Sequence, residues 1–399
     1  MKKSKLMLMF VFVVLVFGFS IGSLITPVRS YSVQENRTLT AHPKLSVKSI
    51  LSGKYQKQYE NFLSDQFFGR DAWVSLATRI QATFHQKDIN GVYIGKDGYL
   101  LEKDEAGDVD HLQVKDNEKY VTKFINAASK KFGKKHVSFM MVPSKTSIMK
   151  NKLPDYASYN DHSDVIKALR HDLNDPNQLL DLSKALNQKN NQYICYRTDH
   201  HWTTLGAYYA YDTFAKQTKM ATPHAAPYYH QVKAYEDFYG TTYNKIHLKV
   251  PADTVTLYRQ KGDTKVKVAF NQGKNYHTMY FDDAAKKGFN RYDVFFSKNT
   301  FQVDIRTHAH TGKTLLMAKD SFANSFVPFL IHDYDHIIMI DYRYGVKPMN
   351  EILAENKDIT DVLVMFNTEK FMQNTKLKPI SEMKKSKTRQ EFNASEFLS

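Results

Sequence analysis

Apolar residues recur along the chain in two patterns, which predict alternating helices and strands over most of its length. In residues 121–132 and 203–216, apolar side chains lie three or four positions apart, as in a helix with one buried face. Short apolar runs at 136–142 and 313–318 predict buried strands. Further strands are predicted at 178–182, 192–196, 336–340 and 361–366, and further helices at 164–173, 322–332 and 349–355. This alternation favours an α/β fold with a mostly parallel sheet between helices.

The longest apolar stretch lies at the N-terminus. Residues 6–25 are apolar except for two glycines and two serines, and about twenty such residues are enough to cross a bilayer. Lysines precede this stretch, which places residues 1–5 in the cytoplasm. Residues 27–30 lack the small-residue pattern of a signal-peptidase site. We therefore expect an uncleaved signal-anchor at 6–26, with everything after it outside the cytoplasm.

Residues 27–110 are expected to lead from the membrane into the main domain. Their apolar spacing predicts helices at 46–67 and 71–85, followed by a hairpin at 91–101 with Lys-Asp-Gly at its turn. The main α/β domain is expected at 111–399. Between about 225 and 300 the alternation is lost in a stretch rich in Tyr, Lys and Asn, which we interpret as an insertion over the functional site. The Lys-rich tail beyond Pro379 is expected to be frayed.

The composition changes this picture in two respects. The formal net charge of +15 favours an anionic partner such as a membrane surface or an anionic polymer of the cell envelope. No RNA- or DNA-binding motif accompanies the charge, so nucleic acid is not an expected partner. The single cysteine, Cys195, excludes an intrachain disulfide and any Cys-rich zinc site. We interpret Cys195 as a small buried side chain on a strand.

The densest chemistry in the sequence is the run Asp199-His200-His201-Trp202. It falls between the strand predicted at 192–196 and the helix predicted at 203–216, and such loops often carry the catalytic groups of α/β proteins. An aspartate two residues before a histidine can bind one imidazole nitrogen and leave the other free to accept a proton. This pattern predicts a general base, which needs a nucleophile.

Ser321 is the candidate nucleophile. It lies in Lys319-Asp320-Ser321, where an apolar strand gives way to a helix. The backbone N–H groups at a helix start are unpaired and favour negative charge, so they could hold an oxyanion beside the serine. Alternatively, Asp320 or Ser321 simply caps the helix. The combination with Asp-x-His on another loop favours a triad of Asp199, His201 and Ser321.

Two alternatives remain open for this region. Asp199, His200 and His201 could bind a divalent metal together with other histidines, but their spacing matches no usual metal motif, so we expect neither metal nor other cofactor. The motif could also be structural, with Trp202 filling a core. Lys145 and Arg343 each follow a predicted strand and could steer an anionic acceptor, or could be solvated loop charges.

The run Asp199-His200-His201-Trp202 resembles the motif that gives the DHHW family of bacterial surface proteins its name. That family is similar to the alginate O-acetyltransferase proteins and, more remotely, to the SGNH hydrolases. Further segments stand in the order that the family shows: 35–37 (Glu-Asn-Arg), 64–70 (Ser-Asp-Gln-Phe-Phe-Gly-Arg), 94–98 (Ile-Gly-Lys-Asp-Gly), 143–145 (Pro-Ser-Lys), 320–322 (Asp-Ser-Phe) and 341–344 (Asp-Tyr-Arg-Tyr). The resemblance covers nearly all of the predicted extracytoplasmic part.

The resemblance implies an SGNH-like three-layer α/β/α domain with Asp199, His201 and Ser321 as its triad. Lys319 departs from the family pattern, which has glycine before Asp-Ser, and so leaves the oxyanion pocket undefined. Asn299 and Asn324 are candidate oxyanion donors, and Trp202 is a candidate substrate contact beside Lys145 and Arg343.

The expected function is O-acyl transfer, most simply of acetyl groups, to a cell-surface polysaccharide or other glycopolymer. An esterase of the same mechanism and a non-catalytic scaffold of an acetylation assembly are the alternatives. By resemblance, the acetyl donor would be an integral-membrane acyltransferase partner.

Overall fold

The computed structural model describes residues 2–32, 37–84, 86–103, 110–155, 157–288, 290–297 and 299–383. The chain divides into two compact units, and each is treated by itself. The first comprises residues 1–102, 197–200 and 239–253, and the second comprises 103–196, 201–238 and 254–399. Glu35 and Asn36 of the family-like segments, His85 at the end of a predicted helix, and residues 384–399 of the tail lie outside the described residues.

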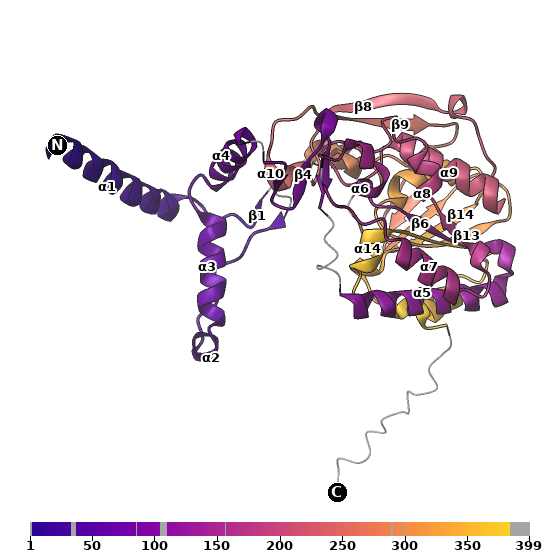
Figure 1. The fold of residues 1–399 in the computed structure, drawn as a ribbon. Helices are drawn as coiled ribbons and strands as arrows, with labels where there is room; N and C mark the ends of the chain where they lie inside the picture. Colours follow the sequence, from indigo (N-terminus) through magenta and orange to yellow (C-terminus); the bar gives the residue numbers. More distant parts are fainter. Residues whose placement is uncertain are drawn as a thin grey trace, which may run out of the picture. The chain divides into compact units, whose positions relative to one another are not determined.

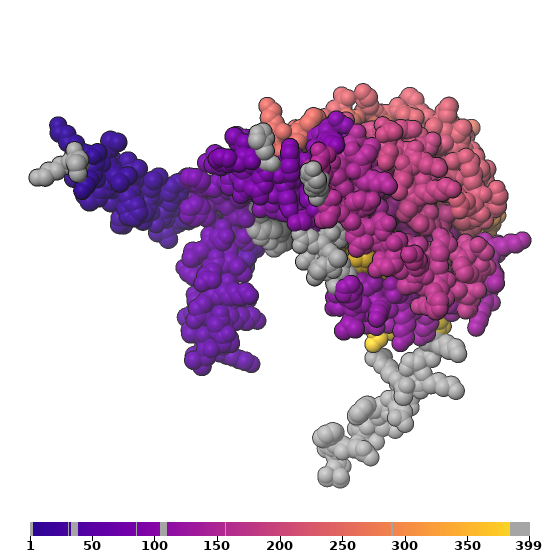
Figure 2. All heavy atoms as spheres, viewed as in Figure 1, coloured from indigo at the N-terminus to yellow at the C-terminus, as the bar shows by residue number. Residues whose placement is uncertain are grey.

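The first unit begins with the predicted apolar helix, α1 (Lys2–Ile25). Its length and composition are sufficient to cross a membrane, with a mean hydropathy of 2.7 in an 18-residue window of the candidate span Lys3–Ile25. Its large apolar side chains are exposed along most of the helix (Figure 2). Near its C-terminal end, Phe19 packs on Phe67 and Trp73 of the following helical segment.

The helix predicted at 46–67 is interrupted. Gly53 adopts a left-handed conformation with φ of 71°, which ends α2 (Val47–Leu51) and starts α3 (Lys54–Gln66). The next predicted helix is α4 (Arg70–Thr83), and the predicted hairpin forms from β4 (Val92–Ile94) and β5 (Leu100–Glu102), which pair antiparallel. The remaining elements of this unit are β1 (Tyr31–Ser32), β2 (Arg37–Thr38), β3 (Asp88–Ile89), the 3-10 turn η1 (Lys96–Gly98) and α10 (Tyr243–Ile246).

An eight-stranded sheet in the order β11-β10-β12-β14-β13-β15-β6-β7 organises the second unit (Figure 1). The strands from β14 to β7 run parallel, whereas β12 and β10 each pair antiparallel with their neighbours. The strands are β6 (Val137–Val142), β7 (Leu179–Asp181), β10 (Lys267–Phe270), β11 (Asn275–Tyr276), β12 (Gln302–Arg306), β13 (Thr314–Lys319), β14 (His336–Ile340) and β15 (Asp361–Asn367). The predicted mostly parallel sheet is confirmed.

Helices cover both faces of this sheet. One face packs against α5, α7, α13 and α14 in a single core that includes Phe124, Phe139, Leu169 and Val364. Figure 1 shows α8 and α9 on the opposite side of the sheet from α5 and α7. The helices are α5 (His111–Phe132), α6 (Lys145–Ile148), α7 (Ser163–Asp172), α8 (Ser183–Asn187), α9 (Thr204–Thr218), α11 (Asp282–Lys287), α12 (Ala323–Phe326), α13 (Met349–Glu355) and α14 (Thr368–Met372).

Residues 225–300 form several elements. The long strand β8 (His230–Phe238) pairs only with β9 (Asp253–Arg259), while β10 and β11 extend the large sheet. After α11, the 3-10 turn η7 (Arg291–Val294) leads into the edge strand β12. Part of this stretch therefore belongs to the main sheet, because β10 binds β12 from Lys267↔Arg306 to Phe270↔Val303.

Three predicted elements differ from the structure. Residues 192–196 do not form a strand of a sheet. Instead, residues 194–196 run antiparallel to residues 201–203 and pair with them through an isolated bridge between Cys195 and Trp202. The helix predicted at 322–332 is only α12 followed by the 3-10 turn η8 (Val327–Leu330), because Pro328 removes a backbone donor. The fraying predicted beyond Pro379 does not hold for Ile380, which is fully buried in the core.

A buried asparagine joins α5 to α14, which predicts a clear dependence of stability on one side chain. Asn117 is fully buried, and its Nδ2 donates to the carbonyl oxygens of Phe371 and Asn374, both at 2.8 Å. Asn117→Ala should lower the free energy of unfolding by roughly 2 to 4 kcal/mol, because both buried carbonyls lose their donor. Denaturant unfolding of the full chain in detergent measures this loss.

The matched control for that measurement is Asn126→Ala on the same helix. Asn126 bonds to Asp172 and Asn174 in an exposed position, where water can replace it. The control should therefore cost less than about 1 kcal/mol. Equal losses for the two variants would contradict the prediction.

Candidate active site

Ser321 lies just beyond the carboxyl end of the central strand β13, in the position that the sequence predicts. Asp320 precedes it and is buried, with its Oδ1 accepting from the amide of Phe322 at 2.9 Å and its Oδ2 from the amide of Asn367 at 2.6 Å. These bonds fix the turn after β13 to the end of β15. Ser321 is therefore held at the edge of the sheet by its neighbour, and α12 begins two residues later.

His201 contacts the predicted nucleophile directly. Its Nε2 lies 2.8 Å from Ser321 Oγ, a hydrogen-bond distance between side chains 120 positions apart in sequence. Both residues are only 5% exposed. The imidazole stacks on the ring of Tyr292, with centroids 4.0 Å apart and planes within 10° of each other. The tyrosine hydroxyl in turn donates to the carbonyl oxygen of Ser321 at 3.0 Å. Tyr292 therefore contacts both the predicted base and the predicted nucleophile.

Trp202 also links the motif to the residues that follow Ser321. It is 1% exposed, and its indole Nε1 donates to Ser325 Oγ at 2.9 Å and to the carbonyl oxygen of Phe322 at 3.2 Å. The residue after the histidine is thus tied to the helix that follows the serine. The backbone amide of Tyr196 also donates to the carbonyl oxygen of His201 at 3.2 Å. These bonds fix the direction of the imidazole.

Asp199 belongs to the first unit, where it is held by a turn at 240–242. The amide and hydroxyl of Thr241 both donate to Asp199 Oδ2, at 2.9 and 3.0 Å. Gly240 packs so closely that a Cβ at that position would lie 2.3 Å from Asp199 Cβ. A glycine is therefore required for this approach. One carboxylate oxygen of Asp199 is fixed by Thr241, and its backbone position is fixed by Gly240.

Asp253 orders the chain just before Asp199. Its buried carboxylate accepts from the amides of Arg197 and Thr198, both at 2.7 Å, and from the Thr198 hydroxyl at 2.5 Å. The carbonyl oxygen of Thr198 accepts from the amide of Tyr243 at 2.9 Å. A buried carboxylate requires several hydrogen-bond donors, and Asp253 takes them from Arg197 and Thr198. Asp253 therefore fixes the backbone just before Asp199.

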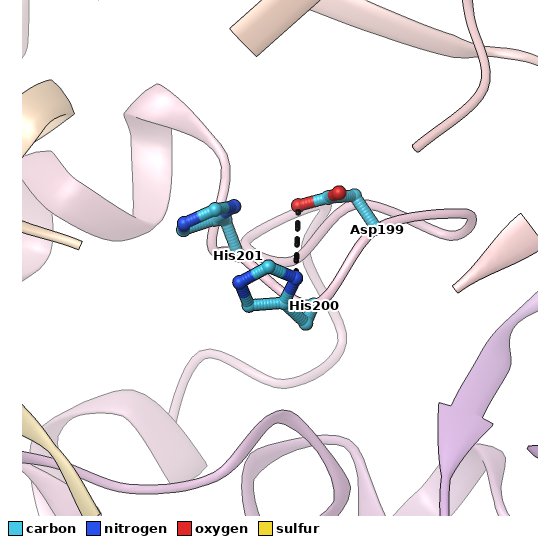
Figure 3. A group of neighbouring side chains, drawn as sticks. All are labelled: Asp199, His200 and His201. Carbon is cyan, nitrogen blue, oxygen red and sulfur yellow. Dashed lines mark ion pairs between the residues drawn. The ribbon is translucent and has the colours of Figure 1, made fainter. Parts of the chain in front are cut away.

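His200 makes a different set of contacts from His201. Its Nδ1 lies 2.7 Å from Thr241 Oγ1 and 3.8 Å from Asp199 Oδ1, and Figure 3 shows the three consecutive side chains of the motif. Each of the three offers one ligand atom, and these atoms lie within 4.8 Å of one another. Neutral imidazoles and a carboxylate could bind a divalent ion, although three residues leave any further ligand to come from elsewhere. A metal-free site remains a prediction.

A family model described as DHHW protein matches residues 97–340, more than half of the chain. The chain belongs to the DHHW protein family. The predicted membership is therefore confirmed, and the matched range includes the motif itself and Ser321. No curated protein sequence matches the chain.

Several solved structures are similar to this chain. A DHHW protein from Eubacterium siraeum aligns with a TM-score of 0.60 and 26% identity, over 73% of this chain and 95% of its own. Bacillus cereus PatB1, solved with a sulfonyl adduct, aligns with a TM-score of 0.58 and 21% identity, over 75% of this chain and 99% of its own. The O-acetyltransferase domain of Pseudomonas putida AlgJ aligns with a TM-score of 0.41 and 14% identity, over 71% of this chain and 93% of its own. The first two alignments confirm the predicted α/β fold.

Behind Ser321, this DHHW protein carries a buried network of charges. Lys319 is 2% exposed, and its Nζ donates to Asn324 Oδ1 at 2.8 Å and lies 3.7 Å from Asp341 Oδ2. Asp341 also binds the guanidinium of Arg343 through two hydrogen bonds, at 2.9 and 2.6 Å. Two cations thus share Asp341, while Asp320 adds a second negative charge nearby, so the network contains balanced charges.

Burial shifts the pKa values of this network. Burial lowers the pKa of Lys319, although Asp341 opposes the shift. Burial raises the pKa of Asp320, although Arg343 opposes it. Burial also works to lower the pKa of Arg343, but its bonds to Asp341 outweigh that effect and raise it. The lysine that departs from the usual family pattern is therefore stabilised in the core by its partners.

The candidate substrate-binding residues Arg343, Asn324, Asn299 and Lys145 lie in different surroundings. Arg343 lies in the charge network, and Asn324 Nδ2 donates to Asn299 Oδ1 at 3.1 Å, so these two asparagines form a pair. Lys145 is buried in the first turn of α6, just after β6. Their roles toward a substrate stay predictions. Burial raises the pKa of the Cys195 thiol to about 12, so this cysteine is an unreactive core residue at neutral pH.

Sequence reasoning missed the residues that support the DHHW motif from a distance. Tyr292, Gly240, Thr241 and Asp253 all lie in the stretch after 225, where no periodicity singles them out. Tyr292 is one of 25 tyrosines. The only local signal is Gly-Thr-Thr at 240–242 after two aromatic residues, which indicates a tight turn but not its partner.

The close contact of Gly240 with Asp199 predicts a steric coupling. Gly240→Ala should lower the free energy of unfolding by about 1 to 3 kcal/mol, because its methyl group would overlap Asp199 Cβ. The Asp199→Gly background removes that Cβ, so the same alanine should cost less there. Denaturant unfolding of the four chains of this double-mutant cycle measures the coupling. Gly18→Ala, with open space around its Cβ, is the control. An equal cost of Gly240→Ala in both backgrounds would contradict the contact.

Proposed function

We propose that this DHHW protein is a membrane-anchored, extracytoplasmic O-acyltransferase that uses Ser321 as its nucleophile. The observation that carries the proposal is the 2.8 Å contact between His201 Nε2 and Ser321 Oγ at the carboxyl edge of the sheet. A serine hydroxyl is a weak nucleophile unless an adjacent base takes its proton. The paired imidazole supplies such a base.

The proposed reaction has two halves. Ser321 Oγ attacks the carbonyl carbon of an acyl ester while His201 Nε2 takes the hydroxyl proton. The tetrahedral intermediate then expels the donor alcohol, which receives that proton, and an acyl-serine remains. In the second half, an acceptor hydroxyl gives its proton to His201 and attacks the acyl-serine. The products are a new ester on the acceptor and the free serine.

Asp199 is proposed to orient the base. Thr241 fixes Asp199 Oδ2, and the carboxylate precedes His201 by two positions in the chain. We assign its remaining oxygen to the Nδ1–H of His201, which selects the tautomer with an unprotonated Nε2. The imidazolium formed during each half-reaction would then be paired with a carboxylate.

The backbone amide of Ser321 is the proposed first oxyanion donor. Among the residues that the structure describes, this amide has no hydrogen-bond partner, whereas the amides of Phe322, Ala323 and Asn324 all bind neighbouring oxygens. A preorganised N–H beside the nucleophile stabilises charge that develops on the carbonyl oxygen. The Asn299–Asn324 pair is a candidate for a second donor, because each amide group carries a further N–H.

The acceptor is proposed to be a cell-surface polysaccharide or other glycopolymer. The predicted anchor supports a position at the cell envelope, and the charge of +15 suits an anionic surface. By family resemblance, an integral-membrane acyltransferase would deliver the acetyl group.

The triad predicts the reactivity of three variants. PatB1 has been solved with a sulfonyl adduct, so a sulfonyl fluoride is a suitable probe for this chain as well. The probe should modify Ser321 in the wild type, as followed by intact mass and peptide mapping, and Ser321→Ala should abolish the adduct. His201→Ala should slow labelling and acetyl transfer by about 1,000-fold or more, because triad residues act as a unit. His200→Ala should cost far less, since its Nδ1 binds Thr241.

The products of a chromogenic acetyl ester, with and without oligosaccharide acceptors, separate the alternatives. Acetylated oligosaccharide supports the transferase, whereas free acetate alone would indicate an esterase. Absence of any Ser321 adduct, together with unchanged acetylation by Ser321→Ala, would contradict the triad. Stoichiometric zinc with activity lost to a chelator would contradict a metal-free site.

The apolar helix α1 predicts the topology of the protein in the cell. We propose one uncleaved span with residues 1–5 in the cytoplasm, because lysines precede the apolar stretch. The protein should remain in the membrane pellet after alkaline extraction, and a C-terminal tag should be digested by protease added to whole cells. An intact mass that begins near Tyr31, or a protected tag, would contradict this topology.

A further inference from the structure

A cavity of about 480 Å³ lies in the second unit and is lined largely by aromatic rings. The rings of Phe270, Tyr276 and Phe281 pack edge to face, with centroids 5.3 to 5.7 Å apart. Tyr280 completes this aromatic wall. Phe281 and Tyr280 are buried, whereas Tyr276 is 41% exposed and forms the accessible side of the wall. The volume falls in the range of small-molecule sites, which is about 300 to 1,000 Å³.

A few polar groups share the cavity with the rings. Asp282, Asp283, Ser297 and Thr300 all line it. Among the described residues, the Ser297 hydroxyl has no hydrogen-bond partner, and it is therefore available to a ligand. The carboxylate of Asp283 is 90% exposed and lies 3.9 Å from the Lys287 ammonium. Asp282 is committed to Lys286 and to the hydroxyl of Tyr235.

This combination selects the chemical class of the ligand. An anion would meet two carboxylates, and a cation would find both carboxylates already paired with lysines on α11. A neutral pyranose fits better, because its C–H face can pack on the electron-rich face of an aromatic ring. Its hydroxyl groups can then bind Ser297 and Asp283, as the few polar groups of a ligand site usually do.

One short segment connects the cavity to the catalytic serine and histidine. Tyr292, at its start, stacks on His201 and binds the carbonyl oxygen of Ser321. Asn299, near its end, accepts from Asn324 on α12. Ser297 and Thr300 of the same segment line the cavity. Phe296 and Ser297 adopt left-handed φ values of 62° and 55°, which are costly for residues other than glycine and give the segment a specific shape.

We propose that this aromatic cavity is a binding subsite for a neutral sugar unit of the acceptor glycan. The assignment rests on the proposed function, in which a glycan is the acyl acceptor. One sugar of that glycan would bind in the cavity while another sugar of the same chain receives the acyl group. The rings hold one pyranose, and Ser297 and Thr300 of the cavity lie within a few residues of Tyr292, which stacks on His201. The subsite would raise the local concentration of the acceptor without taking part in the chemistry.

Calorimetric titration of the full-length protein in detergent with cellotetraose and with tetra-N-acetylchitotetraose tests this proposal. Tyr276→Ala should raise the Kd by about tenfold or more, since exposed aromatic anchors dominate such contacts. Ala284→Trp should do the same by filling the cavity that Ala284 lines. The control is Tyr228→Ala, an exposed tyrosine that also packs among aromatic rings but does not line the cavity. It should bind as the wild type does.

Sulfonylation of Ser321, measured in parallel, separates this subsite from the catalytic proposal. Weaker oligosaccharide binding by both cavity variants, with an unchanged rate of sulfonylation, supports the subsite. If Ser321 is not labelled but the cavity variants still lose binding, the subsite stands and the catalytic proposal falls. If the wild type binds neither oligosaccharide, or if both cavity variants bind as tightly as Tyr228→Ala, the subsite is overturned.

Discussion

Buried polar groups must find partners, and this requirement shapes the carboxyl edge of the sheet. Asp320 illustrates it: a carboxylate with no exposure to water is acceptable only because two backbone amides donate to it. One of those amides is that of Asn367, whose side chain also donates to the carbonyl oxygens of Val142 and Pro143. The ends of β13, β15 and β6 are thereby joined. The position of Ser321 follows from this network rather than from its own contacts.

The same requirement explains how a lysine is accommodated at 319. A buried ammonium without a partner would be strongly destabilising, and its pKa falls as burial favours the neutral form. Asp341 and Asn324 provide the compensating contacts. Since Asn324 lies on α12, just after Ser321, the lysine also fixes the first turn of that helix. A residue that looks like a defect in the sequence motif is therefore integrated into the support of the site.

The parts of the fold that follow from local pattern could be predicted, and the parts that depend on distant partners could not. Strands β13, β14 and β15 are apolar runs with clear ends, so Ser321 and Arg343 could be placed at the sheet edge from sequence alone. The helix after the motif was also evident, and Thr203 caps it by accepting from the amide of Gly206. Tyr292 and Asp253 gave no such signal, because their roles exist only once remote segments meet. The short run at 192–196 was misjudged because an isolated bridge and a strand share the same apolar pattern.

The stacking of Tyr292 on His201 has a chemical consequence beyond packing. In the proposed acyl transfer the His201 imidazole would gain a proton, and the tyrosine ring at 4.0 Å would present its electron-rich face to that charge. The hydroxyl of Tyr292 is hydrogen-bonded to the carbonyl oxygen of Ser321 and to the Ser325 hydroxyl, so the ring cannot rotate away without breaking both bonds. The Tyr292 ring therefore gives the His201 imidazole a fixed surface, and His201 Nε2 lies 2.8 Å from Ser321 Oγ. Tyr292 lies a few residues before Ser297 and Thr300, which line the aromatic cavity, so the proposed base and the proposed sugar subsite are supported by neighbouring residues of the chain.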